Sequence, residues 1–178
     1  MKIGILHHDL EPTEERIKYF FLERNVEAFL KDVRKSSIYD FKDSDIVLNR
    51  VYASVANRDY SSIKKTLNLL SELELKNIYC LNSAKTSLYD YNKFESYKIM
   101  RDNKVLTPKT ILINSAFSLK RVIEESSDEL GYPLILKRNS GGRGKDISKI
   151  NSKLEFKDAL LKKFSLAKSE NYFGGFIA

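Results

Sequence analysis

Short apolar runs alternate with helically spaced apolar residues along the first half of the chain. Four runs have the length and β-branched content of buried strands: residues 2–7, 26–30, 45–48 and 78–81. Apolar positions recur every three or four residues between them, from Pro12 to about Asn25 and across residues 63–73. Proline suits the first turn of a helix, which supports a helix beginning at Pro12. This alternation predicts a parallel sheet with helices on its faces.

The pattern changes after Thr86, so we expect two domains, residues 1–88 and residues 89–178. In the second domain the sequence predicts a helix capped by Asn92, with Tyr97, Ile99 and Met100 on its apolar face. Further strands and helices follow in this order: a strand at 110–113, a helix beginning at Ser115, a strand at 134–137, a helix at 153–165 and a strand starting at Phe176. The predicted fold class is therefore α/β, with a small parallel-sheet domain followed by an α+β subdomain.

A glycine-rich loop follows the predicted strand Leu134–Lys137. It contains Gly141, Gly142 and Gly144, together with Arg143 and Lys145, and a second strand pattern begins at Ile147. Glycine permits positive φ angles and a close approach of the backbone to a ligand. Successive backbone N–H groups in such a turn can form an anion site. The loop thus predicts a lid over nucleotide phosphates, and the alternative is a glycine-rich hairpin without a ligand.

Two better-known phosphate loops do not match this segment. A Walker A loop needs serine or threonine after Gly-Lys, but Asp146 follows Gly144 and Lys145, and Asn139 occupies the upstream glycine position. The dinucleotide fingerprint needs a third glycine and then a helix. Ile147 stands at that position, and a strand pattern follows it.

Composition indicates a globular chain: 42% of the residues are hydrophobic, 31% are charged and only three are proline. This apolar content is enough for a sizeable core. The net charge of +7 would suit a nucleic acid or another polyanion. However, the lysines are scattered, and no aromatic and basic platform of the RNA-binding type is present. We therefore expect a lysine-rich solvated surface and not a nucleic-acid partner.

Other features of the sequence concern the cellular location of the protein and the roles of its cysteine and histidines. No run of about 18 apolar residues is present, so the sequence predicts no membrane span. The apolar part of the N-terminus is too short for a signal peptide. The lone cysteine, Cys80, is expected to be a small buried side chain in a reducing compartment, and we expect a cytoplasmic protein. His7 and His8 are expected to be polar loop residues, since no further histidine completes a metal site.

Several segments, taken in order, resemble the ATP-grasp superfamily and its amino-acid ligases of the RimK and LysX type. They are residues 45–50, 81–83, 91–93, 106–110 and the block 132–137 with its glycine loop. The resemblance covers essentially the whole chain. It implies that residues 1–88 are the pre-ATP-grasp domain. Residues 89–178 would then be an incomplete N-terminal subdomain of the ATP-grasp domain, with a phosphate lid at residues 138–146.

The resemblance also implies which residues bind ATP. Lys93 and Lys137 match the family's two phosphate-binding lysines, although Asn92 stands where the family usually has aspartate. The implied phosphate lid consists of Ser140, Gly141, Gly142, Arg143 and Gly144. Asp146 lies near a position at which many members carry another glycine. Lysine charges and loop N–H groups suit phosphoryl transfer, which depends on positioning and charge stabilisation.

Arg50 is the candidate for binding the acceptor substrate. It follows a predicted strand at its carboxyl end, where open α/β sheets place ligands. Its guanidinium could hold a carboxylate bidentately. The alternative is a surface arginine that pairs with a neighbouring carboxylate such as Asp59, and Arg58 allows the same two interpretations.

Family members continue past the strand at Phe176 with an adenine-pocket segment and the magnesium ligands. We therefore expect this chain to be the N-terminal part of an ATP-dependent carboxylate–amine ligase, with Mg²⁺ ligands beyond Ala178. Its expected substrates are ATP and a small carboxylate and amine, such as glutamate, joined through an acyl phosphate. The 178 residues alone are expected to be inactive, and the full-length form could be a homo-oligomer. The alternative function is a non-catalytic basic α/β module that binds an anionic partner or nucleic acid.

Overall fold

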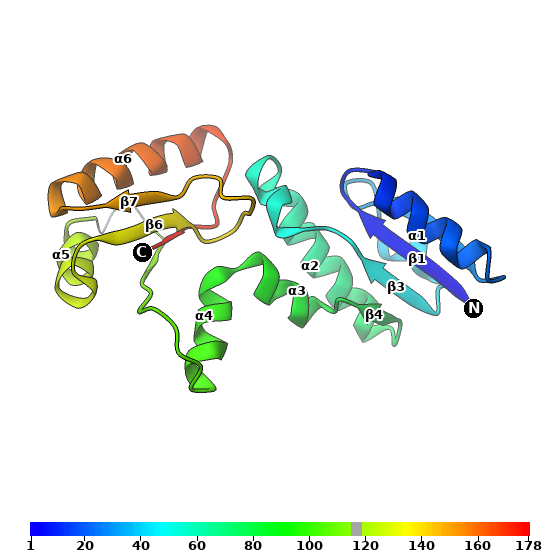
Figure 1. Ribbon diagram of the computed structural model, residues 1–178. Coiled ribbons are helices and arrows are strands. Elements are labelled where there is room, and N and C mark those ends of the chain that lie inside the picture. Colours follow the sequence, from blue (N-terminus) through cyan, green and yellow to red (C-terminus); the bar gives the residue numbers. More distant parts are fainter. Residues whose placement is uncertain (115–118) are drawn as a thin grey trace. The chain divides into compact units, whose positions relative to one another are not determined.

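The structure is a computed structural model that describes residues 1–114 and 119–178 (Figure 1). It divides into two compact units. The first unit comprises residues 1–55 and 61–88, and the second comprises residues 56–60 and 89–178. Across the described residues, no helix is both long enough and apolar enough to cross a membrane.

The first unit contains a four-stranded parallel sheet with the strand order β2-β1-β3-β4. The strands are β1 (Lys2–His7), β2 (Glu27–Asp32), β3 (Ile46–Asn49) and β4 (Tyr79–Leu81). Helix α1 (Pro12–Leu22) connects β1 to β2, and α2 (Tyr60–Leu75) lies between β3 and β4 in the sequence. Two short 3-10 helices, η1 (Ile38–Phe41) and η2 (Ala53–Asn57), complete the elements. The predicted parallel α/β layer is confirmed.

The core of the first unit is closed around β1, whose last five residues are all buried. Gly4 is required there, because a Cβ at this position would lie 2.6 Å from the ring of Phe41. The predicted apolar face of α2 is buried at Ile63 and Leu70. Cys80 is 6% exposed, and its Sγ lies 3.9 Å from the carbonyl oxygen of Leu70 in α2. The prediction of a small buried cysteine is confirmed.

We predict that Cys80 resists alkylation in the native chain. Burial, helped by the charge of Glu74, raises the pKa of the Cys80 thiol to about 12, so little thiolate exists near pH 8. Reaction with iodoacetamide should therefore be at least about a hundredfold slower than for a free thiol. Mass spectrometry can follow the modification directly, because the chain has one cysteine. The urea-unfolded chain is the control, and rapid modification of the native chain would contradict the buried position.

The second unit contains an antiparallel sheet with the strand order β5-β8-β6-β7. Its strands are β5 (Leu112–Ile113), β6 (Leu134–Arg138), β7 (Ser148–Ile150) and β8 (Phe176–Ile177). Its helices are α4 (Lys93–Asp102), α5 (Leu119–Leu130) and α6 (Lys153–Ser169). The boundary between the two units falls within α3 (Ala84–Tyr91), after Leu88. Figure 1 shows α6 running along the sheet. The predicted helix start at Ser115 lies outside the described residues.

Alternation along β6 divides its side chains between two faces. Leu134, Leu136 and Arg138 are buried, whereas Ile135 is 48% exposed and Lys137 is half-buried. The buried face packs into a core formed with α5 and α6, which includes Ile123, Phe156 and Leu160. Because successive strand residues point to opposite faces, Lys137 lies on the face away from this core. The sheet thereby presents a lysine beside the glycine loop without burying it in apolar surroundings.

The sequence prediction fails for two helices. It misses α3, a short helix with little apolar periodicity. It also gives α4 an apolar face, yet no residue of α4 is buried, and Ile99 and Met100 are 37% and 38% exposed. The observed α4 is instead fixed at its N-terminus, where the side chain of Asn92 accepts hydrogen bonds from the backbone N–H groups of Phe94 and Glu95. The predicted cap is therefore right and the predicted face is wrong.

Candidate functional site

The glycine loop between β6 and β7 has a fixed base and an exposed tip. Arg138, Asn139 and Ser140 are each no more than 4% exposed, whereas the tip, residues 143–145, is exposed. The backbone takes the positive φ angles that the glycines predict, +130° at Gly141 and +70° at Gly144. The segment expected to be a lid from 138 to 146 is thus anchored over its first third.

Asn139 connects this base to two other segments. Its backbone N–H donates to the carbonyl of Gly175 at 3.0 Å, and its side-chain Nδ2 donates to the carbonyl of Gly174 at 3.1 Å. Its Oδ1 accepts from the backbone N–H of Phe94 at 2.9 Å, and its carbonyl accepts from the backbone N–H of Lys93 at 3.0 Å. One side chain and its own peptide groups therefore hold the loop against the N-terminus of α4.

Lys93 is brought to the loop by this junction. Its Nζ donates to the carbonyl oxygen of Gly141 at 2.6 Å and lies 3.4 Å from that of Asn139. Burial lowers the pKa of Lys93, and the positive charge of Lys137 lowers it further, against the opposing effect of Asp90. The structure thus brings together Lys93, Lys137 and Gly141, three of the residues predicted to contact phosphate.

Ser140 lies at the buried base of the loop. Its backbone N–H donates to the hydroxyl of Tyr172 at 2.9 Å, and that hydroxyl donates to the carbonyl of Gly175 at 2.8 Å. Burial is the largest cause that raises the pKa of Tyr172, to about 12, so the hydroxyl keeps the proton that it donates. In this conformation the N–H of Ser140 is therefore used within the protein, which leaves the later residues of the loop to meet a ligand.

Arg138 fixes the far end of the loop from the core side. Its Nε lies 2.6 Å from a carboxylate oxygen of Asp146, a second ion pair joins it to Glu170, and its guanidinium lies 4.5 Å from the centre of the Tyr172 ring. The hydrogen bond from Arg138 holds the pKa of Glu170 below its usual value. Lys163 also donates to the backbone carbonyl of Asp146 at 2.7 Å. Asp146 has a φ of +60°, a conformation that glycine adopts easily, and its side chain serves as an anchor.

Asn57 contacts the glycine loop, and no motif in the sequence predicts this contact. Its Nδ2 donates to the carbonyl of Gly142 at 3.0 Å, and its own carbonyl accepts from Nζ of Lys145 at 3.3 Å. A Cβ on Gly141 would lie 2.5 Å from Oδ1 of Asn57. Glycine is thus required at position 141 for two reasons: the positive φ angle and the short distance to the side chain of Asn57.

A groove of about 510 Å³ adjoins Lys137. It is lined mainly by apolar residues of β6, β8 and the segment before β5, among them Pro108, Ile135, Ile177 and Ala178. Two lysines, Lys109 and Lys137, also line it. An apolar groove with cationic side chains at its margin can take a flat, weakly polar group whose charged end reaches a lysine. A nucleotide has this division between base and phosphates.

Arg50 lies in the first unit at the carboxyl end of β3, as predicted. Its Nε lies 3.4 Å from a carboxylate oxygen of Glu14, which is 1% exposed, and its guanidinium contacts Tyr52. Glu14 also accepts a hydrogen bond from the backbone N–H of Glu11 at the start of α1. Arg50 therefore pairs with a neighbouring carboxylate, as the alternative interpretation supposed, and that carboxylate is Glu14.

His7 belongs to a strand, which corrects the prediction of a loop residue, whereas His8 lies in the loop after β1 as expected. His7 is the last residue of β1, and the two side chains are only 7% and 5% exposed. Burial lowers the pKa of His7, although the nearby carboxylates of Asp32 and Glu14 oppose this. Within residues 1–114 and 119–178, no group of three or more histidine, cysteine, aspartate or glutamate residues is placed to hold a metal ion.

Comparison with known proteins gives one match by sequence and several by structure. No protein-family model matches the chain. A coenzyme gamma-F420-2:alpha-L-glutamate ligase of Methanococcus maripaludis is 33% identical over 89 residues, which are 50% of this chain and 30% of that protein. A RimK domain ATP-grasp protein of Sphaerobacter thermophilus superposes with a TM-score of 0.72 at 16% identity. The VanG D-Ala:D-Ser ligase of Enterococcus faecalis superposes with a TM-score of 0.65, also at 16% identity.

These superpositions cover 99% of this chain but 62% of the RimK domain protein and 61% of VanG. The chain therefore spans less than two thirds of the proteins that it matches. At these identities the likeness concerns the fold, and the chain has the fold of a portion of ATP-grasp proteins. The resemblance that the sequence motifs indicate is confirmed at this level.

We predict that Gly141→Ala destabilises the second unit. The substitution combines a φ of +130° with a contact to Oδ1 of Asn57 at 2.5 Å, so the loop or Asn57 must move. The free energy of unfolding should fall by about 2–4 kcal/mol. Urea denaturation followed by circular dichroism measures the change.

Gly144→Ala is the matched control for this experiment. Gly144 also has a positive φ, +70°, but a Cβ there would have no neighbour within 4 Å. Only the backbone strain remains, which costs about 1–2 kcal/mol. Equal losses in the two variants would show that the approach of Asn57 to Gly141 does not constrain the loop.

Proposed function

We propose that this chain is part of an ATP-dependent carboxylate–amine ligase, and that residues 138–146 with Lys93 and Lys137 bind the nucleotide phosphates. Residues 1–88 would serve as the pre-ATP-grasp domain and residues 89–178 as the first part of the ATP-grasp domain. The observation that carries the proposal is the placement of two lysines beside an anchored glycine loop, with Lys93 partly desolvated.

Electrostatics favour an anion at this position. Besides burial, the positive charge of Lys137 raises the cost of charging Lys93 and so lowers the pKa of Lys93. A polyphosphate between them would remove that cost and provide charged acceptors for both. In the structure, the Nζ of Lys93 donates a hydrogen bond to the carbonyl oxygen of Gly141. A phosphate would compete with this carbonyl, and the lysine could exchange one acceptor for the other with little movement.

The loop would act as a partial lid. Its base is held by Asn139, Tyr172 and Arg138, so closure would be confined to the exposed tip at residues 143–145. The tip contributes Arg143, Gly144 and Lys145, which combine positive charge with backbone N–H groups. A short mobile tip on a fixed base can cover phosphates and exclude water without disturbing the lysines.

The proposed reaction has two steps. A carboxylate oxygen of the substrate attacks the γ-phosphorus of ATP, which forms an acyl phosphate and releases ADP. An amine nitrogen then attacks the acyl carbon, and inorganic phosphate leaves as the C–N bond forms and the nitrogen loses a proton. Lys93, Lys137 and the loop would stabilise the phosphoryl charge in the first step. We assign no catalytic acid or base and no magnesium ligand to the described residues.

An amino acid such as glutamate is the proposed type of substrate. The support is the sequence match to a protein whose name includes alpha-L-glutamate ligase. Arg50 is the proposed contact for a substrate carboxylate. Because Arg50 already pairs with the buried Glu14, a substrate carboxylate would have to share the guanidinium or displace this partner. A positively charged amine could then pair with Glu14.

We predict that Lys137→Ala weakens binding of ATP to the 178-residue chain. Loss of a charged hydrogen bond to phosphate should raise the Kd by about 10- to 100-fold. Titration calorimetry with ATP and Mg²⁺ measures it. Lys162→Ala is the matched control, because Lys162 is an exposed lysine of α6, which packs on the opposite, buried face of the sheet.

Unchanged ATP affinity in Lys137→Ala, or an equal loss in Lys162→Ala, would contradict the phosphate site. In the second case the attraction would arise from the overall charge of +7 and would extend to any polyanion. Binding of single-stranded nucleic acid that is tighter than ATP binding and steeply salt-dependent would then favour the basic-module alternative.

A further inference from the structure

One face of the parallel sheet in the first unit is only half covered by a helix. Helix α1 packs mainly against β2 and β1. On β3 and β4 the side chains alternate, and Cys80 faces α2 on the opposite side of the sheet. Register pairs Ile46 with Tyr79 and Leu48 with Leu81, so all four side chains share the face that bears α1. Tyr79 and Leu81 remain 63% and 48% exposed there.

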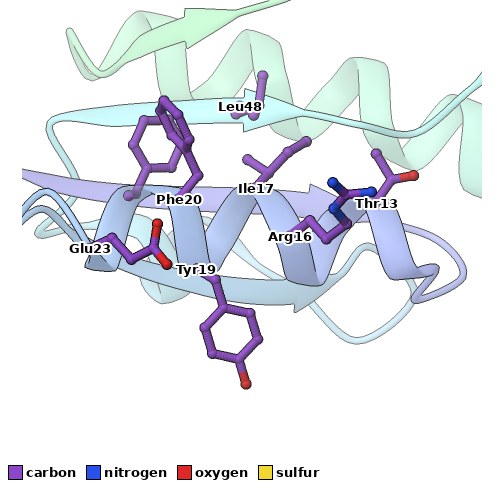
Figure 2. A pocket seen from close by; sticks show the side chains of 8 residues that line it. Thr13, Arg16, Ile17, Tyr19, Phe20, Glu23 and Leu48 are labelled. Atoms are coloured by element: carbon purple, nitrogen blue, oxygen red, sulfur yellow. The ribbon is translucent and has the colours of Figure 1, made fainter.

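The uncovered half is hollowed next to α1. A depression of about 770 Å³ lies between this helix and Leu48 of β3 (Figure 2). Figure 2 shows Ile17 and Phe20 on the side of α1 that faces Leu48, and Phe20 is 51% exposed. We call Ile17, Phe20, Leu48, Tyr79 and Leu81 the open face. All five residues belong to the first unit.

The open face is large enough to form the apolar centre of an interface. From the exposed fractions of Phe20, Tyr79 and Leu81, it presents roughly 300 Å² of apolar surface, which is within the range of functional patches. A stable interface buries about 800 Å² on each partner, and most of the remainder is a polar rim. The open face would therefore need charged neighbours that suit the partner.

Two charged residues flank the open face in a self-complementary arrangement. Arg16 of α1 and Glu23, the residue that caps this helix, both line the depression and are seven residues apart. This spacing corresponds to two turns, about 10.5 Å along the helix, with Phe20 between them. Glu23 also lies 3.9 Å from Arg24, whose guanidinium lies 3.6 Å from the centre of the Phe20 ring. If α1 lies antiparallel to α1 of a second copy, each Arg16 meets Glu23 of the other copy. A two-fold axis near Phe20 satisfies both pairs at once.

We propose that the open face binds a second copy of this chain through a two-fold symmetric contact. Phe20, Tyr79 and Leu81 form its apolar centre, and Arg16 and Glu23 form two equivalent ion pairs across the axis. The contact closes on itself, so it produces a dimer and not a filament. It covers the part of the sheet face that α1 leaves exposed.

Sedimentation equilibrium of the 178-residue chain tests the proposal, with a dimer of two 20.6 kDa chains as the expected species. Arg16→Glu and Glu23→Arg each place like charges together twice, so each should weaken the dimer by at least about tenfold. An equimolar mixture of the two variants should restore it. In that heterodimer both ion pairs again join opposite charges.

Neither substitution should disturb the fold, because both side chains are exposed. Glutamate near the start of α1 and arginine near its end also suit the helix dipole. Lys18→Glu is the matched control, since it makes the same charge change on α1 at a position that does not line the depression. It should leave the dimer intact, and circular dichroism should be the same for all variants.

Three results would overturn the proposal. The chain could remain monomeric at concentrations up to about 100 μM. Its self-association would then be weaker than that of a specific dimer with an interface of this size. A dimer could persist in both charge-reversal variants, which would place the contact on another surface. Finally, the single variants could lose the dimer without the mixture restoring it, which would exclude the two-fold arrangement.

Discussion

The candidate site depends on the hydrogen bonds of Asn139. This residue joins the base of the glycine loop to the N-terminus of α4 through Phe94 and Lys93, and to the C-terminal loop through Gly174 and Gly175. The side-chain amide uses both its donor and its acceptor in these contacts. A buried amide that is hydrogen-bonded stabilises the folded state, whereas a buried amide that has lost its hydrogen-bond partner destabilises it. The position of Lys93 relative to the loop is thus fixed by hydrogen bonds and not by packing of α4, none of whose residues is buried.

Strand alternation places the two cations of β6 on opposite faces of the sheet. Arg138 points to the core side, where Asp146, Glu170 and Tyr172 surround its guanidinium. Lys137, the preceding residue, lies on the other face beside the apolar groove. The two adjacent cations therefore have different surroundings: Arg138 holds the loop, and Lys137 is the proposed contact for phosphate. A shift of one residue in the register of β6 would exchange these roles and bury the lysine.

Much of the fold follows from local patterns in the sequence. The strands of the parallel sheet coincide with short, mainly apolar runs, and Asn92 caps α4 as its residue type predicts. The glycine loop is also visible, because glycine readily adopts the positive φ angles found at Gly141 and Gly144. Local patterns cannot reveal partners distant in sequence. Asn57 reaches Gly142 across 85 residues, and Tyr172 reaches Ser140 across 32, without any motif in either segment. The apolar face expected on α4 fails for a related reason, since periodicity does not show whether another element covers that face.

The central claim is that nucleotide phosphates bind where α4 and the glycine loop meet. A ¹H–¹⁵N NMR titration of the chain with a non-hydrolysable ATP analogue and Mg²⁺ tests it most directly. The account predicts the largest amide shifts at Gly142, Arg143 and Gly144, with a shift at Lys93 as its ammonium leaves the carbonyl of Gly141. Small shifts are expected at Ser140, whose N–H stays bonded to Tyr172. Saturable shifts confined to other parts of the chain, or none at the loop, would contradict the account.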